Sequence, residues 1–70
     1  MREEKIKMWK DNLKKLEEDL ALISQKKGVA AQEGDLSENA AYTMAIEDAE
    51  TTRVRINEVK KIIADLEAGR

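Results

Sequence analysis

The chain has 70 residues, of which 40% are charged and only 3% aromatic, and its formal net charge is −2. It contains no Cys and no His, so disulfides, thiolate chemistry and catalytic triads built on Cys or His are excluded. No apolar run approaches the ~20 residues of a membrane-spanning helix, and the N-terminus lacks the apolar region of a signal peptide, so we expect a cytoplasmic protein with no membrane partner.

The first predicted helix covers about residues 3–27. Lys and Glu, which favour helices, fill most of its polar positions. Its apolar residues are spaced alternately three and four apart, the a/d pattern of a coiled-coil seam. These residues are Ile6, Trp9, Leu13, Leu16, Leu20 and Ile23.

A turn is predicted over about residues 28–35, because Gly28 and Gly34 each cost ~1 kcal/mol relative to Ala inside a helix. The second helix is predicted over about residues 36–68 with the same alternating spacing. Its seam residues are Tyr42, Ala45, Ala49, Thr52, Ile56, Val59, Ile63 and Leu66. The fold class is therefore all-α, with residues 1–70 forming a single antiparallel two-helix coiled-coil hairpin.

Charge is unevenly distributed along this hairpin. No Lys or Arg lies between Gly28 and Thr52, so the basic residues occupy the two ends of the sequence, which meet at the base. The small net charge gives no argument for bulk binding of nucleic acid. The turn end is instead acidic, and its acids are Glu33, Asp35, Glu38, Glu47, Asp48 and Glu50.

Asp35 and Glu38, three residues apart at the predicted turn, have two interpretations. In the first, Asp35 is the N-cap of the second helix and Glu38 completes an arrangement like a capping box. In the second, both carboxylates face one side of the helix and contact a single Mg²⁺, a hard ion that prefers oxygen ligands. Two carboxylates alone make a weak site, so another protein would supply the remaining ligands.

The segment at residues 34–42, GDLSENAAY, resembles the tip motif GDLSENAEY of the bacterial Gre transcript-cleavage factors. Residues 55–59, RINEV, resemble the family's second-helix segment R-I-x-E-L, and residues 15–20, KLEEDL, resemble its first-helix segment K-L-x-x-E-L. The resemblance thus spans nearly the whole chain. Besides Asp35 and Glu38, the matching tip residues are Gly34, Leu36, Ser37, Asn39 and Tyr42.

The resemblance implies a transcription elongation factor that inserts its coiled coil into the secondary channel of RNA polymerase. There, Asp35 and Glu38 would help to hold Mg²⁺ for cleavage of backtracked RNA, so that contact with the RNA 3′ end is indirect. The chain would then be no enzyme by itself, because it stimulates cleavage by the polymerase. No other cofactor is implied.

Several departures from the family pattern leave alternatives open. The family's C-terminal globular domain has no counterpart in this chain, and the stretch between Ile23 and Asp35 is shorter than in the family. Ala31 stands where the family has Arg, and Ala41 where it has Glu. A regulator that occupies the same channel without promoting cleavage is therefore one alternative.

A purely structural coiled coil that self-associates is another alternative, because a two-helix hairpin leaves part of each apolar stripe exposed. Apolar residues off the a/d seam would make the contacts between copies, and these are Leu22, Val54 and Ile62.

Overall fold

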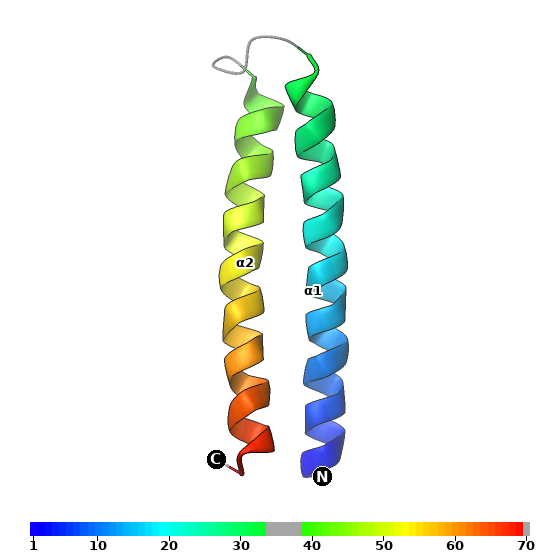
Figure 1. Cartoon of the computed structure of the whole chain (residues 1–70), viewed down its shortest axis with the longest axis vertical. Coiled ribbons are helices and arrows are strands. Elements are labelled where there is room, and N and C mark those ends of the chain that lie inside the picture. Colours follow the sequence, from blue (N-terminus) through cyan, green and yellow to red (C-terminus); the bar gives the residue numbers. More distant parts are fainter. Residues whose placement is uncertain (34–38, 70) are drawn as a thin grey trace.

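The computed structural model describes residues 1–33 and 39–69 as two long antiparallel helices (Figure 1). Helix α1 runs from Arg2 to Ala31 and helix α2 from Ala40 to Glu67. The molecule measures 50 × 15 × 11 Å along its principal axes. The N-terminus and the C-terminal end of α2 lie together at the base, opposite the turn end (Figure 1). The predicted all-α hairpin is confirmed.

The hydrophobic seam holds the helices together. Every seam residue predicted from the alternating spacing is buried or half-buried. Those on α1, including Trp9, are half-buried, whereas Val59 on α2 is the most buried, with 2% of its surface exposed. None of the described residues with a polar or charged side chain is fully buried. Only six described residues, all of them apolar, are fully buried, which is consistent with a core of marginal size for a 70-residue chain.

The predicted end of the first helix is wrong by about one turn. Gly28 lies inside α1, which continues to Ala31. The seam spacing also continues, since half-buried Lys27 and buried Ala30 follow Ile23 at intervals of four and three residues. Packing of this additional turn against α2 offsets the cost of ~1 kcal/mol expected for a helical glycine.

The predicted start of the second helix, at about residue 36, is also corrected. The first helical residue of α2 is Ala40, and Asn39 before it has extended backbone angles, φ −93° and ψ 96°. The side chain of Asn39 accepts a hydrogen bond from the backbone N–H of Tyr42, as an N-cap does. Asn39, and not Asp35, is therefore the N-cap of α2.

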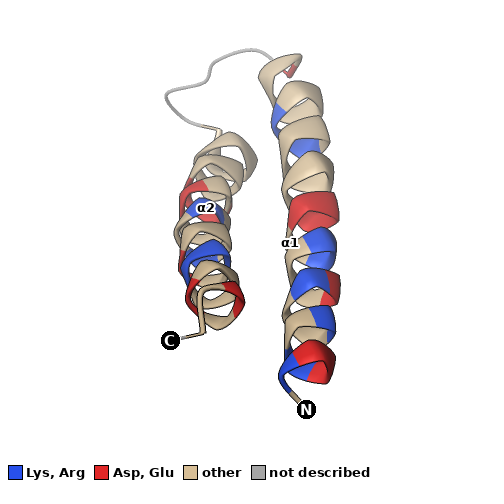
Figure 2. Cartoon of the chain, turned by 60° about the horizontal axis from the view of Figure 1, so that its bottom comes forward, with Lys and Arg blue, Asp and Glu red and all other residues tan. Residues whose placement is uncertain are grey.

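Most charged residues of both helices are exposed. The part of α2 nearest the turn carries no Lys or Arg (Figure 2). At the base, Lys10 of α1 and Glu67 of α2 form an ion pair with a nitrogen–oxygen distance of 3.3 Å. In the part of the chain that the structure describes, neither helix is long and apolar enough to cross a membrane.

Candidate functional site

The turn end of the hairpin is the candidate site, because the seven tip residues singled out in the sequence lie there. Five of them, Gly34, Asp35, Leu36, Ser37 and Glu38, lie outside the described residues. The two others, Asn39 and Tyr42, are described, together with the last turn of α1 and the first turn of α2. The geometry of the site therefore rests on how these two helix ends are joined.

Asn39 connects the two helices through both ends of its side-chain amide. Its Oδ1 accepts a hydrogen bond of 3.1 Å from the backbone N–H of Tyr42, in the first turn of α2. Its Nδ2 donates a hydrogen bond of 2.6 Å to the carbonyl oxygen of Ala30, near the end of α1. One partly buried side chain thus bonds a backbone group at the start of one helix and another at the end of its partner.

These two bonds have a common physical cause. The first N–H groups and the last C=O groups of a helix have no partner within the helix itself. Asn39 serves one group of each kind, because an amide carries both an acceptor and donors. The orientation of the amide follows, since the reverse would set its NH₂ group against the N–H of Tyr42 and its oxygen against the carbonyl of Ala30.

Further backbone contacts complete the turn end. The backbone N–H of Glu33 also donates to the carbonyl oxygen of Ala30, at 3.2 Å. The backbone N–H of Thr43 donates to the carbonyl oxygen of Asn39 at 3.1 Å, and the hydroxyl of Thr43 lies 3.3 Å from the same oxygen. Asn39 is therefore held by both its side chain and its backbone.

A second contact crosses between the helices one turn away. The Nζ of Lys27 on α1 lies 5.9 Å from the ring centroid of Tyr42 on α2, within the range of a cation–π interaction. The half-buried position of Lys27 explains this contact, because the heptad spacing directs its side chain toward α2. The sequence alone did not predict this contact, because the first helix was expected to end at about residue 27.

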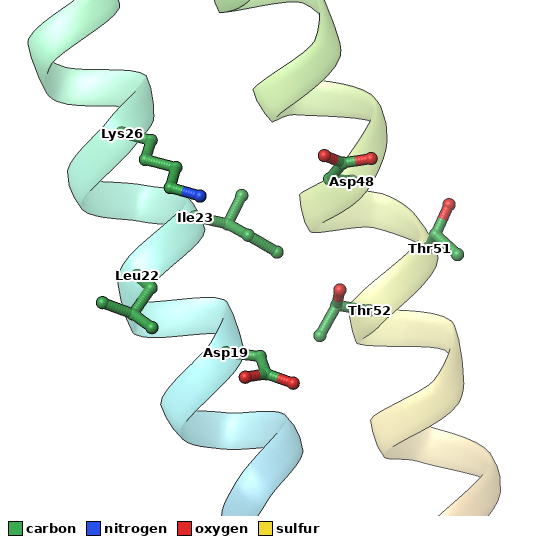
Figure 3. Close-up of a pocket in the computed structure, with 7 residues that line it drawn as sticks. All are labelled: Asp19, Leu22, Ile23, Lys26, Asp48, Thr51 and Thr52. Carbon is green, nitrogen blue, oxygen red and sulfur yellow. The ribbon is translucent and has the colours of Figure 1, made fainter.

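A shallow groove in the half of the rod nearer the turn also brings charged groups together (Figure 3). Asp19 on α1 and Asp48 on α2 line it from opposite sides, with Lys26 and Ile23 also on the α1 side (Figure 3). Nowhere within residues 1–33 and 39–69 do three or more acidic, His or Cys side chains gather as metal ligands would. This groove is therefore no metal centre comparable to the one that Asp35 and Glu38 suggest.

Comparison with known proteins places the hairpin in context. Residues 1–67 match the family model described as "Transcription elongation factor, N-terminal". No curated protein and no solved structure matches the chain. The match covers both helices and the segment between them, which includes every residue of the candidate site.

Proposed function

The chain belongs to the GreA/GreB family of transcription elongation factor N-terminal domains, and from this premise we propose that its hairpin enters the secondary channel of RNA polymerase. There it presents Asp35 and Glu38 near the polymerase active centre and stimulates cleavage of backtracked RNA. The protein does not cleave alone. The observation that carries the proposal is the family match over residues 1–67, which includes the tip motif.

The shape of the molecule supports entry into a narrow passage. A body of 50 × 15 × 11 Å is only two helices wide, and its two chain ends lie away from the turn. Small seam residues, Ala30, Ala45 and Ala49, are buried in the half of the rod nearer the turn. Small side chains let helices approach closely, so this half remains slender.

Asp35 and Glu38 supply only part of the ligand set that a Mg²⁺ ion requires. Asp35 and Glu38 supply carboxylate oxygens, the ligands that Mg²⁺ prefers, but the described residues add no acidic cluster that would complete its coordination. The polymerase would therefore provide the remaining ligands. When bound, the ion would supply an activated water and stabilise negative charge during phosphodiester hydrolysis. The role of this chain is to carry the two carboxylates on a rigid support.

The test is RNA cleavage in a stalled, backtracked elongation complex. We expect the protein to stimulate cleavage and the double variant Asp35→Ala, Glu38→Ala to lose that stimulation while still binding the polymerase. A matched control is Glu17→Ala with Glu18→Ala, which removes the same charge from an exposed position midway along α1. Absence of stimulation by the unaltered protein, or equal stimulation by the tip variant, would overturn the proposal.

A second function, occupation of the channel without cleavage, is favoured by two observations. Ala31, where the family has a basic residue, is the last residue of α1, and Ala41 lies in the first turn of α2. Both positions therefore flank the tip and both lack a charge. Displacement of a complete cleavage factor from the polymerase, with no RNA cleavage by this protein, would support this regulator.

Self-association is the third alternative, and only two of the three apolar side chains expected to make contacts between copies are well exposed. Leu22 and Val54 are 55% and 58% exposed, whereas Ile62 is half-buried. Sedimentation over a range of protein concentrations tests this alternative, and a folded species that stays monomeric throughout would exclude it.

A further inference from the structure

We infer that Asn39 is a positioning residue. By bonding both helices at the turn end, it fixes the positions of Glu33 and Asn39, the two residues on either side of the segment that contains Asp35 and Glu38. The inference rests on the proposed function for its effect on RNA cleavage. The link itself rests on the geometry of Asn39, Ala30 and Tyr42 alone.

The position of Asn39 in the chain gives the link its consequence. Residues 34–38 run from Glu33 to Asn39, so these two residues are the described ends of the acid-bearing segment. Both ends meet at one atom, because the backbone N–H of Glu33 and the Nδ2 of Asn39 donate to the same carbonyl oxygen of Ala30. The separation of the two ends is therefore set by bonds to a single acceptor.

Capping of α2 alone does not account for this arrangement. Ser, Asp and Asn are about equally good N-cap residues, because each provides an oxygen that accepts from the first turn. Only Asn among them also has an NH₂ group, which Asp lacks altogether and Ser replaces with a shorter hydroxyl. The bond to Ala30 thus requires the amide, whereas the bond to Tyr42 does not.

This difference separates the two roles of Asn39 by substitution. Asn39→Ser and Asn39→Asp retain the cap on α2 and lose the link to α1. Asn39→Asp adds a negative charge, which the positive end of the helix dipole favours and the carbonyl oxygen of Ala30 disfavours. Asn39→Ser adds no charge, so agreement between the two variants excludes a purely electrostatic effect. Asn39→Ala removes both bonds.

The first measurement is thermal unfolding followed by circular dichroism. We expect Asn39→Ala to lower the melting temperature by about 4–8 °C, the shift that loss of a helix cap produces in a domain of this size. Both the Ser and the Asp variant should retain the helical content. The Ser variant should keep most of the stability, and the Asp variant should keep less because its carboxylate faces the carbonyl oxygen of Ala30. They then test the link in a folded molecule.

The second measurement is the distance across the turn end in the free protein. The chain has no Cys, so single cysteines introduced at the exposed positions Gln32 and Ala41 accept nitroxide labels cleanly. Dipolar electron paramagnetic resonance should give one narrow distance distribution for the unaltered chain. We expect a broader distribution in both cap-retaining variants.

The third measurement compares binding and cleavage on the backtracked polymerase complex. We expect the Ser and Asp variants to bind with unchanged half-saturation and to lower the maximal cleavage rate on the order of tenfold or more, since small displacements of catalytic groups are costly. A residue that served only as a cap would leave this rate unchanged.

A matched control is Thr51→Ala, which removes a side chain–backbone hydrogen bond of 3.1 Å to Glu47 midway along α2. It should change neither the label distance nor the cleavage rate. Cap-retaining variants that keep a narrow distance, or that cleave at the rate of the unaltered protein, would overturn the inference. Failure of the unaltered protein to stimulate cleavage overturns the proposed function instead, and the label distance still tests the link.

Discussion

Lys27 and Tyr42 pair across the hairpin, with the ammonium nitrogen 5.9 Å from the centroid of the ring. Lys27 occupies a position in the heptad pattern at which an apolar residue is usual, and it is half-buried there. Long cationic side chains commonly bury their aliphatic stem and keep the charge at the surface, and here the charge lies over the Tyr42 ring. This contact joins α1 and α2 close to the Asn39 link.

Replacement of Lys27 by Gln removes the cation and retains a polar side chain of similar reach. We expect the free energy of unfolding to fall by about 0.5–1 kcal/mol, the usual contribution of a cation–π pair near the surface. Urea unfolding followed by circular dichroism measures the change. Lys26→Gln, at the exposed neighbouring position, is the control and should have little effect. Equal losses in the two variants would show that the ring contact contributes nothing.

Gly28→Ala should stabilise the protein by about 0.5–1 kcal/mol, because Gly28 lies inside α1 and glycine is unfavourable in a helix interior. A Cβ atom at this position meets nothing within 4 Å. The same substitution at Gly69 is the contrast, since its φ of +79° disfavours any residue with a Cβ. We expect Gly69→Ala to lower the melting temperature and Gly28→Ala to raise it. A decrease for Gly28→Ala would contradict the helical assignment.

Val59→Ala tests the apolar core at its most buried residue. Loss of buried methyl groups and the cavity that remains should cost about 1–3 kcal/mol in the free energy of unfolding. Val54→Ala removes the same atoms from the same helix at a side chain that is 58% exposed. Denaturant unfolding should show a loss of free energy of unfolding only for Val59→Ala. Similar losses in the two variants would contradict the assignment of Val59 to the buried seam.

The ion pair between Lys10 and Glu67 should contribute little. Both side chains are about half exposed, at 55% and 51%, and pairs of this kind contribute roughly 0–1 kcal/mol. Because Glu67 is the last residue of α2, its carboxylate is also repelled by the negative end of the helix dipole. A double-mutant cycle with Lys10→Met and Glu67→Gln isolates the pair from this effect. The coupling should disappear at about 1 M salt, and a coupling that persists there would refute the assignment of an exposed pair.

Periodicity was sufficient to predict the hairpin and its seam. Alternating intervals of three and four residues placed Leu13 and Ile56 in the interface, where the structure has them. The end of α1 was harder to predict, because Gly28 is a helix breaker by propensity and the next seam position holds a charged residue, Lys27. Tertiary packing of Ala30 decided the outcome.

The start of α2 shows a different difficulty. Asp35, Ser37 and Asn39 are all favourable N-cap residues within five positions of one another, and spacing alone does not select among them. The selection depends on Ala30, whose carbonyl oxygen approaches Asn39 only after the helices pair. The roles of Asp35 and Glu38 stay predictions, since both lie outside the described residues.

The elongated hairpin places its two ends far apart, so substitutions at the turn end and at the base should affect stability independently. Asn39 and Val59 are about 20 residues apart on one helix, which corresponds to roughly 30 Å. Substitutions this far apart, without shared neighbours, have additive effects on stability. A destabilising substitution at the turn end therefore lowers the stability of the whole hairpin by its own amount, and a stabilising substitution at the base can offset it. Such additivity lets selection alter the tip chemistry while substitutions along the helices compensate for the stability that is lost.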